Sequence, residues 1–268
     1  MSTEFIAFLS PPGSAISGYD RAALSSAQAS SVPQTFVEAM SVRETVFVEE
    51  QHVALNNEFD MDDARSFHWV VYASVANTID ATPGKGGRKG SGSETARMPV
   101  GTIRLVPPPH PPHPEPGSQH KIDNNNAEGA AAAPVASEGR AVRSKWHDGK
   151  EPYVKLGRVA TLPAYRGLGL GRLLVNAALE WAGNNPEAVM PLKSAASREA
   201  AKIEGGLGRA AERWKGLVLV HAQRSVERMW TKHGFEKDEG MGVWDEEGIE
   251  HVGMWRRIPV KAEERVIR

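Results

Sequence analysis

The chain has 268 residues, a formal net charge of -1 and a pI near 6.8, so it lacks the concentrated basic charge typical of nucleic-acid-binding proteins. It contains no cysteine, which excludes disulfides, thiolate metal sites and a cysteine nucleophile. No apolar run approaches the ~18 residues of a membrane span, and the N-terminus has no basic region typical of a secretion signal. We therefore expect a cytoplasmic protein that acts on small molecules rather than on nucleic acid or membranes.

The first half of the chain predicts a strand, a helix and a hairpin. Short apolar runs at 5–9, 67–75 and 98–106 predict strands, and a linker rich in glycine and proline at 82–97 joins the last two. A helix is expected after Pro33, because apolar residues then recur along one face: Phe36, Met40 and Phe47.

An acidic stretch lies between this helix and the strand at 67–75. Its polar residues are Asn56, Glu58, Asp60, Asp62 and Asp63. The spacing lacks the glycine and the final glutamate of a helix-loop-helix calcium site. We interpret the stretch as a solvated loop, or as one side of a pocket for a cationic substrate.

The segment 107–149 is rich in proline, then polar, then rich in alanine. It lacks the patterned apolar residues that offset the entropy cost of ordering a chain, so an extended, partly disordered surface insertion is expected. His110, His113 and His120 fall in it, but histidines in a mobile segment hold no fixed geometry, so no metal site is predicted.

The stretch Tyr153–Trp181 predicts a strand, a glycine-rich turn and an amphipathic helix in succession. The strand stops at Pro163, the turn covers Arg166–Gly171, and the helix is expected to end at Gly183 and Pro186. The first turn of a helix has unpaired N–H groups, and glycine lets a phosphate approach them closely. The sequence therefore predicts an anion-binding turn here, or a glycine-rich connection without a ligand.

The last third of the chain predicts a buried strand, a helix and a hairpin. The strand covers 217–220, and the helix at 226–233 ends at Gly234, which suits a C-terminal cap. Two further strands, at 242–244 and 251–258, are joined by turn residues.

Two motifs resemble the GNAT superfamily of acetyl-CoA-dependent N-acetyltransferases. Arg166–Gly171 matches the family signature R/Q-x-x-G-x-G/A, and Gln223, Trp230, Gly234 and Phe235 are similar to its N-x-x-A-x-x-x-Y-x-x-x-G-F segment. The stretches 43–51 and 248–254 further resemble one branch of small bacterial-type members.

The resemblance implies an α/β fold: a twisted, largely antiparallel mixed sheet, flanked by helices and splayed between its fourth and fifth strands. It implies a single domain over 1–268, with insertions at about 10–32, 82–97 and 107–149. Acetyl-CoA, as the cosubstrate, would lie in the opening against Val159, Ala160, Thr161, Arg166, Gly167, Leu168, Gly169, Leu170, Gly171, Arg172 and Gln223.

The chain departs from the family pattern at the expected catalytic positions. The family commonly has a tyrosine acid where this chain has Trp230, whose indole N–H is not a usable acid at neutral pH. The candidate bases by residue type and position are Glu58, Asp60, His68, Glu250 and His251. Two hypotheses follow: an N-acetyltransferase acting on a primary amine of a small molecule, or a CoA-binding module with weak or no transfer. Neither the acceptor nor an oligomeric state follows from the sequence.

Overall fold

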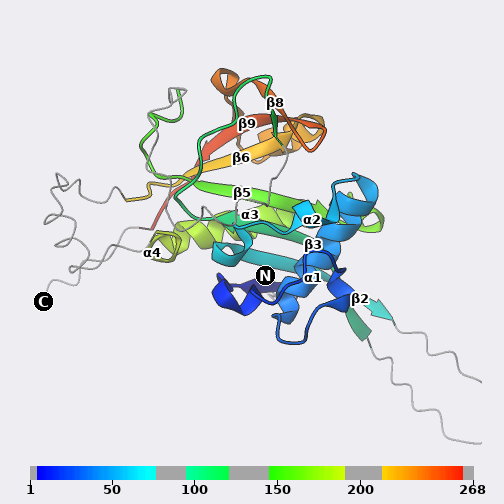
Figure 1. Ribbon diagram of the computed structural model, residues 1–268. Helices are drawn as coiled ribbons and strands as arrows, with labels where there is room; N and C mark the ends of the chain where they lie inside the picture. The colour runs from blue at the N-terminus through cyan, green and yellow to red at the C-terminus, as the bar shows by residue number, and fades with distance from the viewer. Residues whose placement is uncertain (1–4, 77–94, 121–144, 191–212, 262–268) are drawn as a thin grey trace, which may run out of the picture.

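The computed structural model describes residues 5–76, 95–120, 145–190 and 213–261, which form one twisted sheet with helices on both faces (Figure 1). The strands follow the order β1-β2-β3-β5-β6-β9-β8-β4, and β7 pairs with β9. Pairing is antiparallel except between β5 and β6 and between β4 and β8. The strands are β1 Ile6–Leu9, β2 Phe67–Ala76, β3 Thr95–Val106, β4 Gln119–His120, β5 Val154–Thr161, β6 Leu217–Gln223, β7 Glu236–Lys237, β8 Val243–Glu246 and β9 Ile249–Arg257. The predicted α/β class with a largely antiparallel sheet is confirmed.

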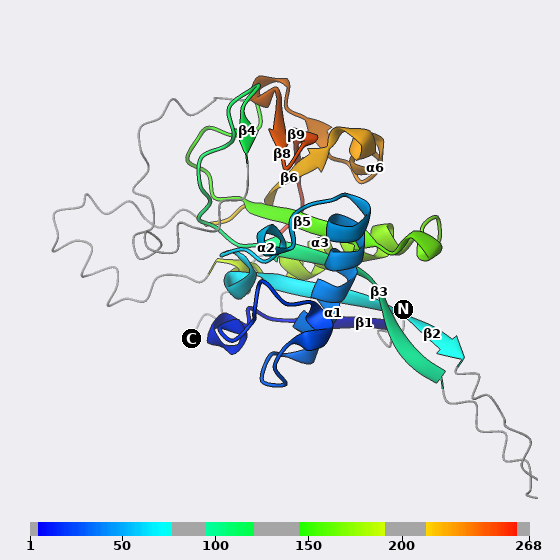
Figure 2. The same ribbon diagram turned by 45° about the vertical axis from the view of Figure 1, so that its right-hand side comes forward.

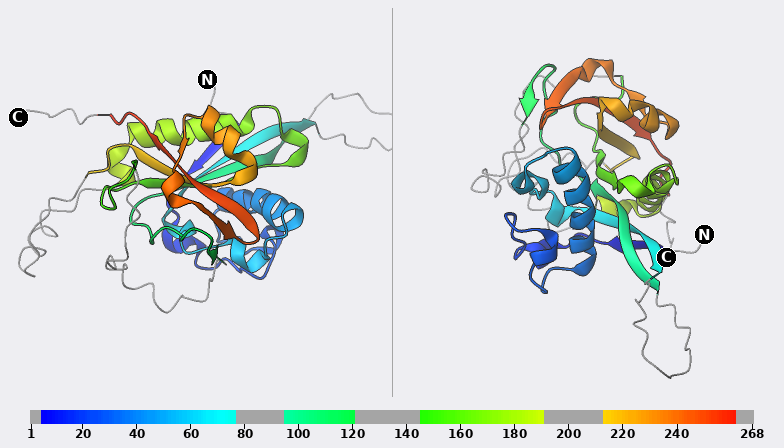
Figure 3. Two further views of the ribbon diagram at one scale, coloured as in Figure 1. Left: turned by 90° about the horizontal axis from the view of Figure 1, so that it is seen from above. Right: turned by 90° about the vertical axis from the view of Figure 1, so that its right-hand side faces the viewer.

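Two helices cover opposite faces of the sheet (Figure 3). On one face lies α1, Gln34–Arg43, which continues without a break into a π-helical segment, Glu44–Glu50. On the other lies α3, Leu170–Asn184. The remaining α-helices are short: α2 Leu55–Glu58, α4 Pro186–Val189 and α6 Glu227–Lys232. None of the described helices is long and apolar enough to span a membrane.

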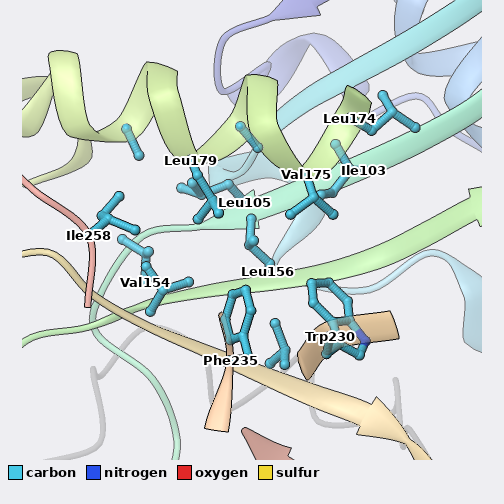
Figure 4. Packing of buried hydrophobic residues seen from close by; sticks show 14 of the residues in the cluster. Ile103, Leu105, Val154, Leu156, Leu174, Val175, Leu179, Trp230, Phe235 and Ile258 are labelled. Atoms are coloured by element: carbon cyan, nitrogen blue, oxygen red, sulfur yellow. The ribbon is translucent and has the colours of Figure 1, made fainter. Parts of the chain in front are cut away.

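The main core lies between α3 and the sheet (Figure 4). Alternate residues of β3 and β5 point toward the helix, and α3 presents one apolar face to them. The buried side chains include Ile103, Leu105, Val154, Leu156, Leu174, Val175 and Leu179. Burial of each such side chain contributes roughly 1.5–3 kcal/mol. The spacing of three to four residues in the sequence predicted an amphipathic helix here, and Leu174 and Ala178 of the predicted face are buried, whereas Leu173, Ala177 and Trp181 are only partly buried beside this core.

The end of α3 agrees with the sequence: the helix ends at Asn184, between Gly183 and Pro186. Gly183 itself lies in the last turn of α3 and does not cap it. A Cβ at Gly183 would lie 2.6 Å from the carbonyl oxygen of Pro259, in the segment after β9. Glycine is required there by the close approach of another backbone, and not by a helix cap.

The ends of two other elements agree with the sequence. Gly234 follows α6 with φ +76°, and its N–H donates to the Thr231 carbonyl at 2.9 Å, as a capping glycine does. β8 and β9 form the predicted hairpin, with Glu247 and Gly248 at positive φ in a turn that suits the twist of the strands.

The start of the proline-rich segment differs from the extended surface insertion that was expected from the sequence. Residues 107–120 pack against the sheet, and β4 extends its edge beside β8 (Figure 2). His110 Nε2 donates to the carbonyl oxygen of Tyr153 at 2.9 Å, and the rings of His110 and His113 stack on Tyr153. The histidine rings of the segment pack against an aromatic side chain next to β5, and the sequence pattern, which lacks apolar residues here, did not predict this packing. The predicted linker at 82–97 is too long at its end, because residues 95–97 belong to β3. Residues 82–94 of the linker, the alanine-rich residues 121–144 and residues 191–212 lie outside the described residues.

Candidate active site

The sheet opens between β5 and β6. The parallel ladder joins only Val154–Leu156 to Val218–Val220, and beyond Leu156 no backbone pairing continues between the two strands. β5 still runs on to Thr161 beside β3, and β6 runs on to Gln223 beside β9, so the two strands diverge (Figure 1). Among the described residues, the edge of β5 that faces the opening has no strand partner beyond Leu156. Val159, Ala160 and Thr161, predicted to contact the cofactor, lie on this part of β5, and the Thr161 carbonyl accepts from Arg166.

The glycine turn lies at the end of β5 and leads into α3. Gly167 and Gly169 adopt φ of +80° and +82°, and a Cβ at either position would meet nothing within 4 Å. Gly169 is the N-cap of α3, so the first N–H groups of the helix face the same open side. The turn therefore has the left-handed glycine conformations and the open approach of an anion cradle. Leu168 and Leu170 alternate with these glycines, and Leu168 is 70% exposed.

The two arginines of the turn differ in their surroundings. Arg166 donates to Glu50 at the end of the π-helical segment, with Nη1 to Oε1 at 2.7 Å, and its Nε donates to the Thr161 carbonyl at 3.0 Å. Arg172 is exposed, and among the described residues it has no hydrogen bond or ion pair. Arg172 is thus the guanidinium that is available for a phosphate without breaking another contact.

Side-chain amides bridge the opening where the ladder has ended. Gln223 Nε2 donates to Gln51 Oε1 at 2.8 Å, and Asn57 Nδ2 donates to Glu247 Oε1 at 3.1 Å. These bonds join the segment after α1 to β6 and to the β8–β9 turn. Gln223, predicted beside the cofactor, therefore lies at the rim of the opening.

Three carboxylates of the acidic stretch 56–63 are buried or largely buried, which corrects the interpretation of the stretch as a solvated loop. Asp63 is fully buried, and it accepts from Arg43 and Arg104 at 2.7 Å each. Glu58 is 1% exposed and pairs with Arg43. Asp60 accepts from Arg104 at 2.6 Å. Because each carboxylate is matched by an arginine, this stretch presents no free negative charge for a cationic substrate.

The same network holds the bulge beside the opening. β5 has a bulge here: between Gly157 and Ala160 it has two residues opposite a single residue of β3. One of the two, Arg158, adopts φ +51°, which is unfavourable for an L-residue. Arg158 forms ion pairs with Glu58 at 3.1 Å and with Asp60 at 3.0 Å. These ion pairs stabilise Arg158 in its strained conformation, since Arg158 has no partner in the ladder with β3.

Glu58 and His68, two of the candidate bases, are both part of this network. His68 is 1% exposed, and its Nε2 lies 3.0 Å from the Asp63 carbonyl oxygen. Burial lowers the pKa of His68 to about 4. Both side chains are therefore engaged in interactions inside the protein.

Trp230 and His251 lie apart from each other. Trp230 is 4% exposed in the core beside α3, with its ring centroid 5.2 Å from that of Phe235. His251, on β9, lies opposite Gln223 on β6, and its Nδ1 is 2.8 Å from the Ile249 carbonyl oxygen. Its Nε2 lies 4.0 Å from Glu246. Of the candidates named from the sequence, His251 is thus the one next to Gln223 at the opening.

The structure adds two residues that the sequence did not single out, His221 and Glu246. His221 Nδ1 and Glu246 Oε1 are 2.8 Å apart, and Trp244 Nε1 donates to the same oxygen at 2.7 Å. His221 directly follows the apolar run 217–220, which by itself predicts only a buried strand. Among the described residues, no group of three or more metal-ligating side chains is arranged to hold a metal ion.

Several buried histidines predict acid sensitivity. Burial lowers the pKa of His68, His113 and His221 to about 4 and that of His110 to about 3. The unfolded chain takes up these protons near pH 6.5 and the native state only at lower pH, so acidification favours unfolding. We expect the melting temperature to fall by more than about 10 °C between pH 6.5 and 4, measured by calorimetry.

Asp63, the most deeply buried carboxylate of the arginine network, does not contribute to this fall in stability. Arginines overcome the effect of burial and hold the pKa of Asp63 well below its usual value, so the stability that it contributes is lost only at still lower pH. Replacement of His68 by glutamine should flatten the curve between pH 6.5 and 4, whereas His120→Gln, at an exposed ring, should leave it unchanged. A flat curve for the unmodified protein would contradict the assignment of neutral buried histidines.

With the geometry described, the comparison with protein families identifies the class. Residues 94–201 match the model of the Acetyltransferase (GNAT) family, and this stretch contains β3, β5, the glycine turn and α3. The stretch therefore belongs to the GNAT acetyltransferase family, and the resemblance noted in the sequence is confirmed. Membership of this family indicates an acyltransferase that uses a CoA thioester as its cosubstrate. The open edge of β5 and the glycine turn fit such a cosubstrate.

Solved structures are similar to the chain at low identity. They include an acyl-CoA N-acyltransferase from Pseudomonas aeruginosa, with 20% identity over 82% of this chain and 89% of that one, TM-score 0.39. ElaA from Escherichia coli has 17% identity over 87% and 95%, TM-score 0.40. A CoA-dependent acyl-homoserine lactone synthase, BjaI, has 13% identity over 95% and 83%, TM-score 0.45. No curated protein sequence matches the chain.

Proposed function

We propose that the protein is an N-acetyltransferase that moves an acetyl group from acetyl-CoA directly to a primary amine of a small molecule. The observation that carries the proposal is the opening between β5 and β6 next to the glycine turn. The turn and Arg172 bind the pyrophosphate, and the free edge of β5 binds the pantetheine arm. The thioester then lies in the opening, where an amine can approach it from the face of α1.

Direct transfer needs the amine to be deprotonated and aimed at the thioester carbonyl. The polar side chains of the opening lie on the face opposite α3, which makes this face the amine side. Because the carboxylates of residues 58–63 are matched by arginines, the amine is expected to bind in its neutral form and not as a salt-bridged cation.

A CoA-binding module with weak or no transfer is the alternative, and Trp230 is the observation that favours it. The indole replaces the usual tyrosine acid and is buried in the core. Under the proposed function, the departing thiolate takes its proton from another group of the site or from solvent.

Thiol release separates the two readings. Purified protein, acetyl-CoA and a panel of primary amines should give release above the buffer rate with at least one amine, and mass spectrometry should show the acetylated amine. Longer acyl-CoA esters in the same assay test the acetyl preference. Absence of release with every amine, despite CoA binding, would leave the binding module as the function.

Thermal shift tests the cosubstrate independently of turnover. Acetyl-CoA at about 100 times its Kd should stabilise the native state by about 2.7 kcal/mol, which raises the melting temperature by about 5 °C. ATP and NAD at the same concentration should have little effect. Stabilisation by ATP or NAD without stabilisation by acetyl-CoA would contradict the assignment of the site.

A further inference from the structure

His221 lies at the point where the sheet opens. Leu156 and Val220 are the last pair of the β5–β6 ladder, and Gly157 and His221 are the next residues on the two strands. Val220 and Ala222 belong to the core beside α3, so the side chain of His221 lies on the opposite face of the sheet, where its ring is 4.8 Å from that of Trp244 and 6.4 Å from that of His113. His221 is therefore the first side chain on the amine side of the opening.

The two ring nitrogens of His221 differ, because only Nδ1 has a hydrogen-bond partner among the described residues. The ionised Glu246 carboxylate can only accept, so Nδ1, at 2.8 Å, carries the ring proton and donates it. Nε2 then carries a lone pair. It is buried, and it has no hydrogen-bond partner among the described residues. A buried polar atom without a partner is costly, so it marks a place where a ligand group is expected.

Two neighbouring groups fix the charge state of this pair. Burial and the nearby Lys155 lower the pKa of His221, while His221 and Lys155 outweigh burial and hold the pKa of Glu246 well below its usual value. Trp244 also donates to Glu246, which fixes the carboxylate in position. At neutral pH the pair is thus an oriented, neutral imidazole beside a carboxylate.

The residue of β5 that follows the ladder has no side chain. A Cβ placed on Gly157 would meet nothing within 4 Å, and Gly157 lies with Lys155 on the face opposite α3, because Val154 and Leu156 face α3. Gly157 is the first residue of β5 beyond the ladder, as His221 is of β6, so this open space lies where the two strands diverge.

We propose that His221 is the general base of acyl transfer, that Glu246 is the residue that positions it, and that Gly157 leaves room for the amine. The inference rests on the proposed function and names the residues that carry out its chemistry. It assigns to His221 the role that the sequence offered to Glu58, Asp60, His68, Glu250 and His251.

The transfer is balanced with these groups. The amine nitrogen forms a bond to the thioester carbonyl carbon, and its proton passes to His221 Nε2. The C–S bond then breaks, and the thiolate of CoA leaves and takes up the proton from the imidazolium. The products are the N-acyl amine and the free thiol of CoA. An amine nitrogen becomes far more acidic as it bonds to the carbonyl carbon, so a base of low pKa is sufficient.

Kinetics of matched variants test the role. His221→Gln should lower kcat by about 100-fold or more with the best amine of the panel, with the KM for acetyl-CoA changed less than about threefold. Glu246→Gln should lower kcat by about tenfold, because the imidazole is kept but poorly oriented. Gly157→Val should raise the KM for the amine. His147→Gln, at a buried histidine bonded to the Glu151 carbonyl, serves as the control and should retain wild-type kcat.

A spectroscopic measurement does not depend on turnover. Nitrogen-15 NMR of histidine-labelled protein, with His221 assigned through the His221→Gln spectrum, should show a neutral ring protonated at Nδ1 from pH 6 to 8. If His221→Gln unfolds, His221→Asn with its melting temperature measured replaces it.

The outcomes separate the two proposals. Wild-type transfer with unchanged kcat in the His221 and Glu246 variants would overturn the role of His221 and leave the proposed function standing. No transfer by the wild type with any amine would overturn the proposed function. A ring protonated at Nε2 would overturn the inference in either case, because that nitrogen could not accept a proton.

Discussion

Gly169→Asp is expected to weaken acetyl-CoA binding by about tenfold to a hundredfold, or about 1.4–2.8 kcal/mol. Gly169 adopts φ +82° as the N-cap of α3, so any side chain strains the turn. An aspartate there also directs a negative charge into the space proposed for the pyrophosphate. Calorimetric titration with acetyl-CoA measures the change.

Two variants separate strain from charge. Gly169→Ala adds the strain without the charge, and it should weaken binding several-fold less than aspartate does. Gly117→Asp places the same residue in a comparable backbone conformation, φ +75° with open space around it, in the segment before β4. It should leave the affinity unchanged. Equal affinity of wild type and Gly169→Asp would show that the turn does not bind the pyrophosphate.

Asp63→Asn is expected to lower the free energy of unfolding by about 3–5 kcal/mol, because it leaves buried arginine charge without its partner. Asp63 is fully buried, and its carboxylate accepts from Arg43, from Arg104 and from the Asp60 N–H. The melting temperature should fall by about 6–15 °C. Thermal or denaturant unfolding followed by circular dichroism measures the loss.

Glu50→Gln is the matched control, since it also removes a carboxylate bonded to an arginine. The Glu50–Arg166 pair is exposed, so the loss should stay below about 1 kcal/mol. A loss of similar size in both variants would contradict the view that burial of the network determines its energetic weight.

Local patterns in the sequence were sufficient for most of the fold. Helix α3, strand β5 and the glycine turn are continuous stretches whose periodicity and composition report on their own surroundings. The hairpin of β8 and β9 likewise depends on turn residues that are adjacent in the chain. Such elements are predictable because neighbouring residues decide them.

Contacts between distant residues account for the errors. Glu58, Asp60 and Asp63 have the sequence pattern of a solvated loop. The arginines that pair with them are distant in the chain, and Arg158, which donates to Asp60, is 98 positions away from it. Gly183 lies at the end of α3 as predicted, but only the position of Pro259 shows why glycine is required there.

The site was predicted unevenly for the same reason. Its glycine turn is one continuous motif. His221 and Glu246, in contrast, come from different strands, and neither stands out from its neighbours in sequence. Their pairing depends on the register of β6 and β8 on either side of β9, which no local pattern specifies.

The arginine–carboxylate network has a consequence for ionic strength. Dissolved ions screen charges that are open to water, but they do not enter a site in which Arg43 and Asp63 are buried. Added salt therefore loosens the exposed Arg166–Glu50 pair at the glycine turn and leaves the buried pairs intact. The bulge beside the opening keeps its shape at salt concentrations that weaken electrostatic attraction at the entrance.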